Sequence, residues 1–248
     1  MAKIISVFGP PDTGKTTISV VIAQQLAEKG FNVCLVCADN IVPTIPTLLP
    51  QSITKVGEIK DKVHSIGKIL SEIEYSTNDI LKEVVFTKRF SKLVLIGYAY
   101  GENTLSYAMP TEYDVSVFYN KLGTMVDYIV VDCGSDFSNP LAKVGIESAD
   151  RVIKVIGSSY KDITYFASNE ELIPEGEVKK SEFITVYPMY KDMDAIEFLA
   201  DFYGTIDYTI RYNNQISKMM QYGEYFMKGF PSEYTRIIKN LLEEINFS

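Results

Sequence analysis

The chain has 248 residues, of which 46% are hydrophobic and 23% charged, so it is long enough for one large domain or two small ones with a sizeable core. Its formal net charge of −8 argues against a surface coated in basic residues for non-specific DNA binding, although a local basic patch is compatible with it. The sequence contains no apolar run of about 18 residues that would predict a membrane-spanning helix. The N-terminus lacks the apolar segment and cleavage site of a signal peptide.

The chain opens with a predicted βαβ unit. Lys3–Phe8 is a short apolar run and is predicted to form a buried strand. Thr16–Lys29 carries apolar residues at helical spacing, which predicts an amphipathic helix that ends before Gly30. The next predicted strand is Asn32–Cys37. The unit has about 30 residues, as expected for two parallel strands joined by a helix.

Further strands and helices alternate along the rest of the chain. The other predicted strands are Lys92–Gly97, Tyr128–Asp132, Arg151–Ile156, Glu182–Val186 and Thr205–Ile210. The other predicted helices are Glu58–Glu74, Asp79–Val84, Glu112–Leu122, Pro140–Ala149, Tyr160–Asn169, Asp192–Phe202 and Ser232–Phe247. Near-continuous apolar strands between helices predict an α/β fold with a mostly parallel central sheet and helices on both faces. We expect a single domain over residues 1–248, in which residues 41–92 are the least regular and form an insertion or a partner-facing region.

The three cysteines, Cys34, Cys37 and Cys133, lie in apolar strand-like contexts. This pattern does not predict a disulfide framework, and a reducing cytosol is the expected compartment. Cys34 and Cys37 have C-x-x-C spacing, but residues three apart on a strand point to opposite faces. We therefore expect them to be small buried side chains and not shared metal ligands. The only histidine, His64, is expected at the surface.

A phosphate-binding motif follows the first predicted strand. Gly9-Pro10-Pro11-Asp12-Thr13-Gly14-Lys15-Thr16 matches G-x-x-x-x-G-K-[ST], the P-loop, at every fixed position. In such a loop, backbone N–H groups and the helix N-terminus point at a phosphate. Lys15 is expected to reach the β- and γ-phosphates, Thr16 to offer its hydroxyl to Mg²⁺, and Thr17 to contact the α-phosphate. The motif sits between a strand and a helix, so we predict that Gly9–Thr17 binds a nucleotide.

Two carboxylates are predicted at the same edge of the sheet. Asp39 follows the second strand, and Asp132 ends a later apolar strand. Ligands bind outside the carboxyl ends of strands in open α/β sheets, so either side chain is placed to hold Mg²⁺, most simply through water, or to orient an attacking water. Lys15, Asp39 and Asp132 are therefore the predicted catalytic residues. The structural alternative for each aspartate is the cap of a helix or a turn.

These segments together resemble the MinD/ParA group of P-loop ATPases, including septum-site, plasmid-partition and pilus-associated TadZ-like members. The resemblance covers most of the chain. The matching elements are G-K-T-T at Gly14 to Thr17, Asp39 as the second acid of a D-x-D element, Asp132 as the switch II aspartate, Ser148 to Val155 as an ADxxIxV stretch, and Ile210 to Glu224 as an IPxD…GE segment.

The chain also departs from the pattern of this group. Pro10 stands where such ATPases usually carry a signature lysine, which in the family reaches across a nucleotide-sandwich dimer to the partner's phosphates. Pro11 and Asp12 replace two glycines, Cys37 replaces the first acid of D-x-D, Arg211 replaces the proline of IPxD, and Tyr187 lies near the position of an adenine-contacting asparagine. TadZ-like members also depart from the standard loop and give the nearest analogy.

The resemblance implies ATP or ADP with Mg²⁺ as cofactors, a homodimer, and a protein partner in a larger apparatus. Removing a cation from a phosphoryl-transfer site slows the reaction by orders of magnitude, but the backbone amides and Lys15 remain. We therefore expect ATP binding with slow or partner-dependent hydrolysis in a nucleotide-dependent positioning or assembly factor. DNA is a less favoured partner because of the negative charge. Membrane contact through the C-terminal helix is also less favoured, because Glu243 and Glu244 balance its basic residues.

Two alternatives remain open at the level of sequence. One is a largely non-hydrolysing nucleotide-binding adaptor of a pilus, secretion or conjugation apparatus. The other, less favoured, is an ATP-dependent kinase or transferase, because Gly9-Pro10 and Asp12 also resemble the loop of polynucleotide kinases.

Overall fold

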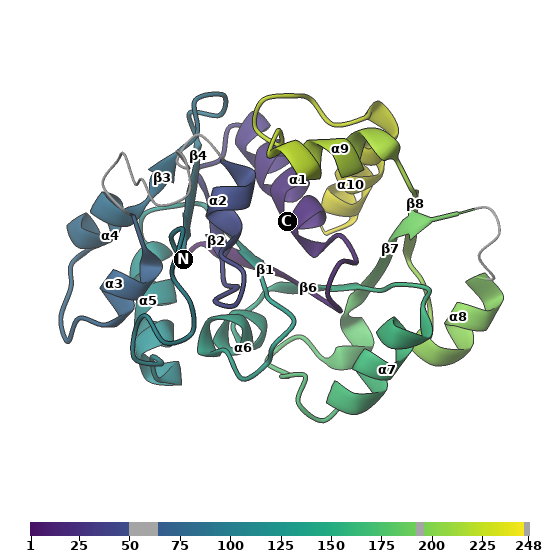
Figure 1. Cartoon of the computed structure of the whole chain (residues 1–248), viewed down its shortest axis with the longest axis horizontal. Helices are drawn as coiled ribbons and strands as arrows, with labels where there is room; N and C mark the ends of the chain where they lie inside the picture. The colour runs from purple at the N-terminus through teal and green to yellow at the C-terminus, as the bar shows by residue number, and fades with distance from the viewer. Residues whose placement is uncertain (50–63, 192–195, 246–248) are drawn as a thin grey trace.

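The computed structural model describes residues 1–49, 64–191 and 196–245, and it contains one eight-stranded sheet with the strand order β3-β4-β2-β5-β1-β6-β7-β8 (Figure 1). Every paired strand is parallel to its neighbour except β3, which pairs antiparallel with β4 at the edge. The strands span Lys3–Phe8 (β1), Val33–Cys37 (β2), Val85–Phe86 (β3), Leu93–Gly97 (β4), Tyr128–Asp132 (β5), Arg151–Val155 (β6), Ile184–Tyr190 (β7) and Tyr208–Arg211 (β8). The predicted mostly parallel α/β architecture is therefore confirmed.

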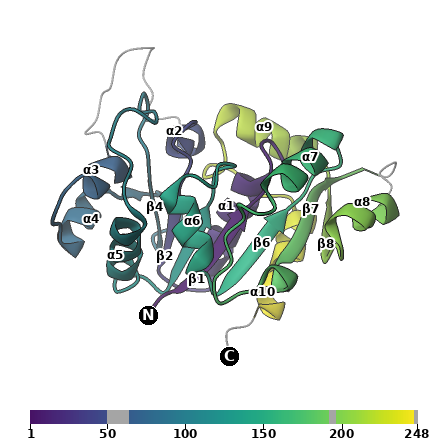
Figure 2. The ribbon, with the colours of Figure 1, turned by 90° about the horizontal axis from the view of Figure 1, so that it is seen from below.

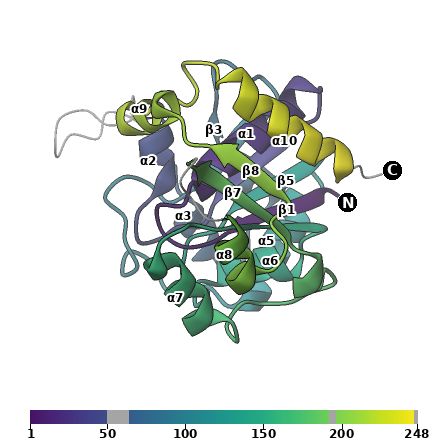
Figure 3. The ribbon, with the colours of Figure 1, turned by 90° about the vertical axis from the view of Figure 1, so that its right-hand side faces the viewer.

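Helices cover both faces of this sheet, as Figures 2 and 3 show. The helices are α1 (Lys15–Glu28), α2 (Thr44–Leu48), α3 (Ile66–Leu70), α4 (Thr77–Glu83), α5 (Glu112–Leu122), α6 (Pro140–Glu147), α7 (Tyr160–Asn169), α8 (Ile196–Tyr203), α9 (Asn214–Tyr222) and α10 (Ser232–Glu244). In Figure 3, α1, α9 and α10 lie on one side of the sheet, and α5 to α8 lie on the other. Such coverage explains why the central strands are apolar along their whole length.

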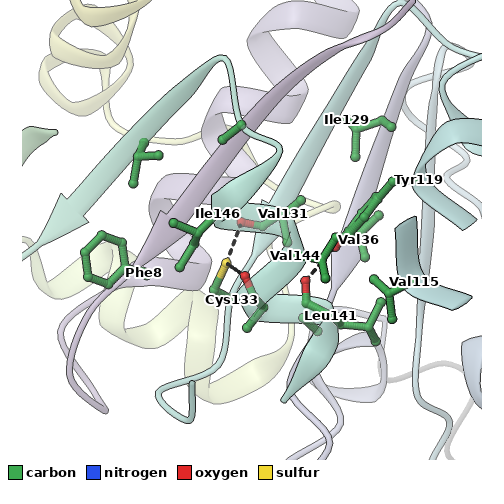
Figure 4. Packing of buried hydrophobic residues seen from close by; sticks show 14 of the residues in the cluster. Phe8, Val36, Val115, Tyr119, Ile129, Val131, Cys133, Leu141, Val144 and Ile146 are labelled. Atoms are coloured by element: carbon green, nitrogen blue, oxygen red, sulfur yellow. Dashed lines mark hydrogen bonds between the residues drawn. The ribbon is translucent and has the colours of Figure 1, made fainter. Parts of the chain in front are cut away.

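The sheet separates two hydrophobic cores. Cys34 packs in the core under α5 and α6, whereas Cys37 packs in the core under α1 and α10. This confirms that the two side chains point to opposite faces, and all three cysteines are buried free thiols. Figure 4 shows the first core, in which the Cys133 thiol faces the carbonyl oxygens of Val131 and Ala142. The Tyr119 hydroxyl there donates to the Leu141 carbonyl at 2.8 Å.

Helix α1 differs from the predicted amphipathic helix. Nearly all of its side chains from Lys15 to Ala27 are buried, on every side of the helix. One reason is that α10 packs against α1 on the same side of the sheet, so that a second helix also covers α1. The buried α10 residues in this shared core are Tyr234, Ile238, Leu241 and Leu242. A helix covered on both sides need not show one polar face. Its end agrees with the sequence, because Gly30 adopts a φ of 96° directly after the last turn.

The irregular region holds more structure than the sequence indicated. Of the predicted helix Glu58–Glu74, the described part is helical only over α3, Ile66–Leu70, so the prediction is wrong for residues 71–74. Residues 58–63 of that prediction lie outside the described part of the chain. Helix α2 and strand β3 were not predicted, and neither was α9. A short helix or a two-residue strand leaves too few residues to establish a period. His64 is partly exposed and its Nδ1 lies 2.8 Å from the Lys82 carbonyl oxygen.

The C-terminal helix packs against the body of the protein, as predicted for its apolar stripe. Four side chains of α10 are buried in the core that it shares with α1. Its predicted end at Phe247 lies outside the described residues. Within the described part of the chain, every helix is too short or too polar to cross a membrane.

Candidate functional site

The P-loop joins the end of β1 to the start of α1 at the centre of the sheet. Strand β1 lies between β5 and β6, so the loop is flanked by the segments that leave these strands. Gly9 has a φ of 155°, and a Cβ atom there would lie 2.1 Å from the Val155 carbonyl oxygen. Gly14 has a φ of 93° and caps α1, and its missing side chain leaves room for Pro188 of β7. Both fixed glycines of the motif are thus required by close approach or by backbone conformation.

Lys15 points back across the loop that contains it. Its Nζ donates to the Pro10 carbonyl oxygen at 2.6 Å and to the Ser135 hydroxyl at 2.9 Å. The side chain is 9% exposed, and this burial lowers its pKa, while Asp132 and Asp39 oppose that effect. Thr13 also donates its hydroxyl to the Pro10 carbonyl, at 2.8 Å. The loop is therefore closed by side chains that converge on one carbonyl oxygen.

Asp132 lies directly behind the start of α1. Its Oδ2 accepts the Thr16 hydroxyl at 2.8 Å, and its Oδ1 accepts the Ser19 hydroxyl at 3.2 Å. The side chain is 3% exposed, and desolvation raises the pKa of the carboxyl group to about 6, although both hydroxyls and Lys15 pull it down. The structure thus brings Lys15, Thr16 and Asp132 together, as the sequence predicted. Ser19 was not predicted, because a serine inside a helix carries no motif of its own.

Asp39 and Asp136 lie nearby and make local contacts. The Asp39 Oδ1 accepts the backbone N–H groups of Ile41 and Val42, both at 2.9 Å, so it caps a turn after β2. Asp136 in the same way accepts the backbone N–H of Ser138 at 2.8 Å. Both aspartates also line the cavity beside Lys15. The turn-capping role considered for Asp39 is therefore present, and its role toward a metal or water stays a prediction.

A cavity of about 840 Å³ opens beside the P-loop at the carboxyl ends of the strands. One wall contains the loop residues Pro11, Asp12 and Gly14 to Thr17, with Asp39 and Asp132. Further lining comes from segments that were not assigned to the site from the sequence, namely Pro188, Met189, Tyr212, Asn213, Ile216, Ser217, Met220, Gln221, Tyr225 and Tyr234. These residues belong to β7, to α9, to the segments on either side of α9, and, for Tyr234, to α10. The cavity is large enough for a drug-sized ligand and combines a polar wall with a mostly apolar one.

Thr17 has a partner that only the folded chain supplies. Its Oγ1 lies 2.7 Å from the Tyr225 hydroxyl, in a buried contact between α1 and the segment after α9. The predicted contact of Thr17 with an α-phosphate stays a prediction, and both Thr17 and Tyr225 line the cavity.

The electrostatic balance of the cavity is negative. Of the described residues that line it, four are aspartates, namely Asp12, Asp39, Asp132 and Asp136, whereas Lys15 is its only lysine or arginine. Asp12 is exposed and has a φ of 60°, the left-handed conformation that favours the glycine it replaces in the resemblance. A polyphosphate bound here would need more positive charge than Lys15 alone supplies.

The solved structures that resemble this chain share its full length. A ParA family ATPase from Chlorobium tepidum matches with a TM-score of 0.74, 18% identity and 99% coverage of both chains. A candidate plasmid partition protein from Borrelia burgdorferi bound to AMPPNP has a TM-score of 0.70, 19% identity and 98% coverage of both chains. MinD from Pyrococcus horikoshii complexed with Mg-ADP has a TM-score of 0.69 and 17% identity, over 100% of this chain and 97% of that one.

Neither a protein-family model nor a curated protein sequence matches the chain. The order of its strands, the P-loop after β1 and the likeness over both whole chains nevertheless agree. The chain has the fold of the MinD and ParA P-loop ATPases.

Proposed function

We propose that this protein binds an adenine nucleotide with Mg²⁺ and acts as a nucleotide-dependent positioning or assembly factor, with slow or partner-dependent ATP hydrolysis. The observation that carries the proposal is the cluster of Lys15, Thr16 and Asp132 at the mouth of a cavity of about 840 Å³. Proteins with this fold have been solved with AMPPNP and with Mg-ADP, which supports the same ligand class here.

The donor atoms of the site fit Mg²⁺. Thr16 and Asp132 present oxygen atoms only, which this hard cation prefers, and Mg²⁺ usually binds through few protein ligands together with phosphates and water. Among the described residues no group of three or more His, Cys, Asp or Glu side chains forms a protein-only metal site. We therefore assign Thr16 as the direct ligand and Asp132 and Asp39 as ligands through water. The cation would neutralise phosphate charge beside four carboxylates, so binding should depend strongly on Mg²⁺.

Slow hydrolysis is supported by the absence of a second cation in the described lining of the cavity. Pro10 offers a carbonyl oxygen to Lys15 and Thr13, and its ring cannot reach a phosphate as a lysine would. One missing donor or cation in a water-excluded site costs about 100- to 1,000-fold in rate. The non-hydrolysing adaptor is therefore the second candidate function. A partner that supplies a lysine or arginine to the phosphates would favour the positioning factor with partner-dependent hydrolysis.

The surface beside the cavity supports a nucleotide-linked homodimer. Ile41, Val42 and Met220 line the cavity and are 62%, 60% and 55% exposed, respectively. Apolar residues at the mouth of a charged cavity gain from being covered. We propose that a second copy covers them when nucleotide is bound. Size-exclusion chromatography with light scattering should show a larger species with Mg-ATP than without it.

The decisive experiment is a calorimetric titration of the whole chain with Mg-ADP and Mg-ATP. Saturable binding that requires Mg²⁺ and is lost in Lys15→Ala supports the proposal. The matched control is Lys143→Ala, which removes an exposed lysine paired with Glu112 outside the cavity and should leave the affinity unchanged. An equal nucleotide affinity of the unmodified protein and Lys15→Ala would contradict the proposed nucleotide binding at the P-loop. A DNA-binding assay with and without Mg-ATP at physiological salt then separates a partition role from an adaptor role, because tight ATP-dependent binding favours partition.

A further inference from the structure

A buried tyrosine stands behind the start of the P-loop helix. Tyr225 is 2% exposed and lies in the segment between α9 and α10. Its hydroxyl lies 2.7 Å from the Thr17 Oγ1, and its backbone carbonyl accepts the Gln24 side-chain amide at 2.9 Å. Tyr225 is therefore fixed on α1 at two points, while its side chain also forms part of the cavity wall.

The direction of the hydroxyl contact depends on what occupies the cavity. A threonine hydroxyl has one proton to donate and can accept from others. A phosphate oxygen only accepts, so Thr17 must donate to it when a nucleotide is bound. Tyr225 must then donate to Thr17, because the two hydroxyls cannot both act as acceptors in one hydrogen bond. Burial raises the pKa of Tyr225 to about 12, which keeps its proton in place at neutral pH.

We propose that Tyr225 is a positioning residue for nucleotide binding, which donates to the Thr17 Oγ1 and so directs the Thr17 proton toward the α-phosphate. The proposal rests on the proposed function and deepens it, since it assigns a role to a residue some 200 positions beyond the P-loop. A hydrogen bond that polarises the next one in a chain strengthens it, and this effect is largest in a site shielded from water.

The chain provides a matched control in Tyr119 of α5. This tyrosine is 3% exposed, and its hydroxyl donates to the Leu141 carbonyl oxygen at 2.8 Å. It lies in the core on the other face of the sheet and does not line the cavity. Tyr119→Phe therefore removes a buried tyrosine hydroxyl and its hydrogen bond without changing the nucleotide site.

The test is a double-mutant cycle on Mg-ADP affinity, measured by calorimetry with Tyr225→Phe, Thr17→Val and the double variant. We expect Tyr225→Phe to weaken binding about fivefold, the value of roughly one hydrogen bond. In the Thr17→Val background, Tyr225→Phe should weaken it no further. Tyr119→Phe should bind Mg-ADP as the unmodified protein does, and thermal unfolding without nucleotide should show that all variants fold.

The outcomes distinguish a failure of the Tyr225 role from a failure of nucleotide binding itself. The role of Tyr225 would be overturned if the losses of affinity in Tyr225→Phe and Thr17→Val simply added in the double variant. It would also be overturned if Tyr225→Phe bound Mg-ADP as tightly as the unmodified protein while Lys15→Ala did not bind it. Nucleotide binding itself would stand in both cases. A comparable loss of affinity in Tyr119→Phe would also overturn the role of Tyr225, because the general effect of losing a buried hydroxyl would then explain the result. If the unmodified protein binds no Mg-ADP, the proposed function and the role of Tyr225 fall together.

Discussion

Replacing Asp132 by asparagine should stabilise the ligand-free protein at neutral pH. The Asp132 carboxyl is 3% exposed, and its pKa rises from 3.8 to about 6 because burial disfavours the charged form. The folded protein therefore binds this proton more tightly than the unfolded chain does. Stability is highest while the group is protonated in both states, below pH 3.8, and is lost as the pH rises through about 6. Above that pH, the shift in the pKa of Asp132 lowers the free energy of unfolding by about 3 kcal/mol relative to its value below pH 3.8.

Asparagine removes this cost while it keeps partners for the neighbouring hydroxyls. Thr16 and Ser19 now donate to the carboxylate, and hydroxyls can accept as well as donate, so an amide can pair with both. Lys15 loses an attractive neighbour in the variant, which makes about 3 kcal/mol an upper limit.

Urea unfolding with EDTA at pH 7.5 and pH 5 measures this effect. The gain in unfolding free energy of Asp132→Asn over the unmodified protein should fall at pH 5 to about half its value at pH 7.5, because the native Asp132 carboxyl is then mostly protonated. Asp136→Asn is the control, since this exposed aspartate caps a turn at the same cavity. If Asp132→Asn were less stable than the unmodified protein at pH 7.5, or if the difference in unfolding free energy were equal at both pH values, burial of the Asp132 charge would not destabilise the protein.

Two further changes test the loop itself. Pro10→Lys should raise the ATP hydrolysis rate about 10- to 100-fold in a phosphate-release assay. The rate per chain should increase with protein concentration, because the added lysine acts on a second copy. An unchanged rate would show that the missing lysine does not limit hydrolysis. Asp12→Gly should raise the free energy of unfolding by up to about 1 kcal/mol, because it relieves a φ of 60° at this residue. Asp136→Asn is the control, because it also removes a carboxylate from the cavity but relieves no backbone strain. Equal urea midpoints for Asp12→Gly and the unmodified protein would show that the loop is not strained.

The phosphate-binding half of the site could be predicted from the sequence because its parts lie close together or at the ends of strongly apolar strands. The P-loop is one continuous segment, and Asp132 ends a strand with the near-continuous apolar character of a buried parallel strand. The topology then brings them together, because β1 and β5 are neighbours with Val7 opposite Asp132. These relations follow from local pattern and from the general rules of parallel sheets.

The other half of the cavity could not be predicted, because it depends on contacts between distant segments. Tyr225 meets Thr17 only in the folded chain, where the segment between α9 and α10 lies against α1, and no local spacing in the sequence records that contact. The packing of α10 against α1 explains why α1 lacks the expected polar face. Helix α9 has one buried residue, Met219, so its helical period carried little signal.

A single-turnover experiment measures ATP binding and ATP hydrolysis by this protein in one assay. The whole chain is mixed with less than one equivalent of radiolabelled ATP and excess Mg²⁺, passed over a desalting column at intervals, and the bound nucleotide is separated by chromatography. We expect that nucleotide is retained, that it stays ATP for many minutes, and that Lys15→Ala retains none. If the unmodified protein retained no nucleotide, it would not be a nucleotide-binding protein; if bound ATP became ADP within seconds without a partner, hydrolysis would not be slow.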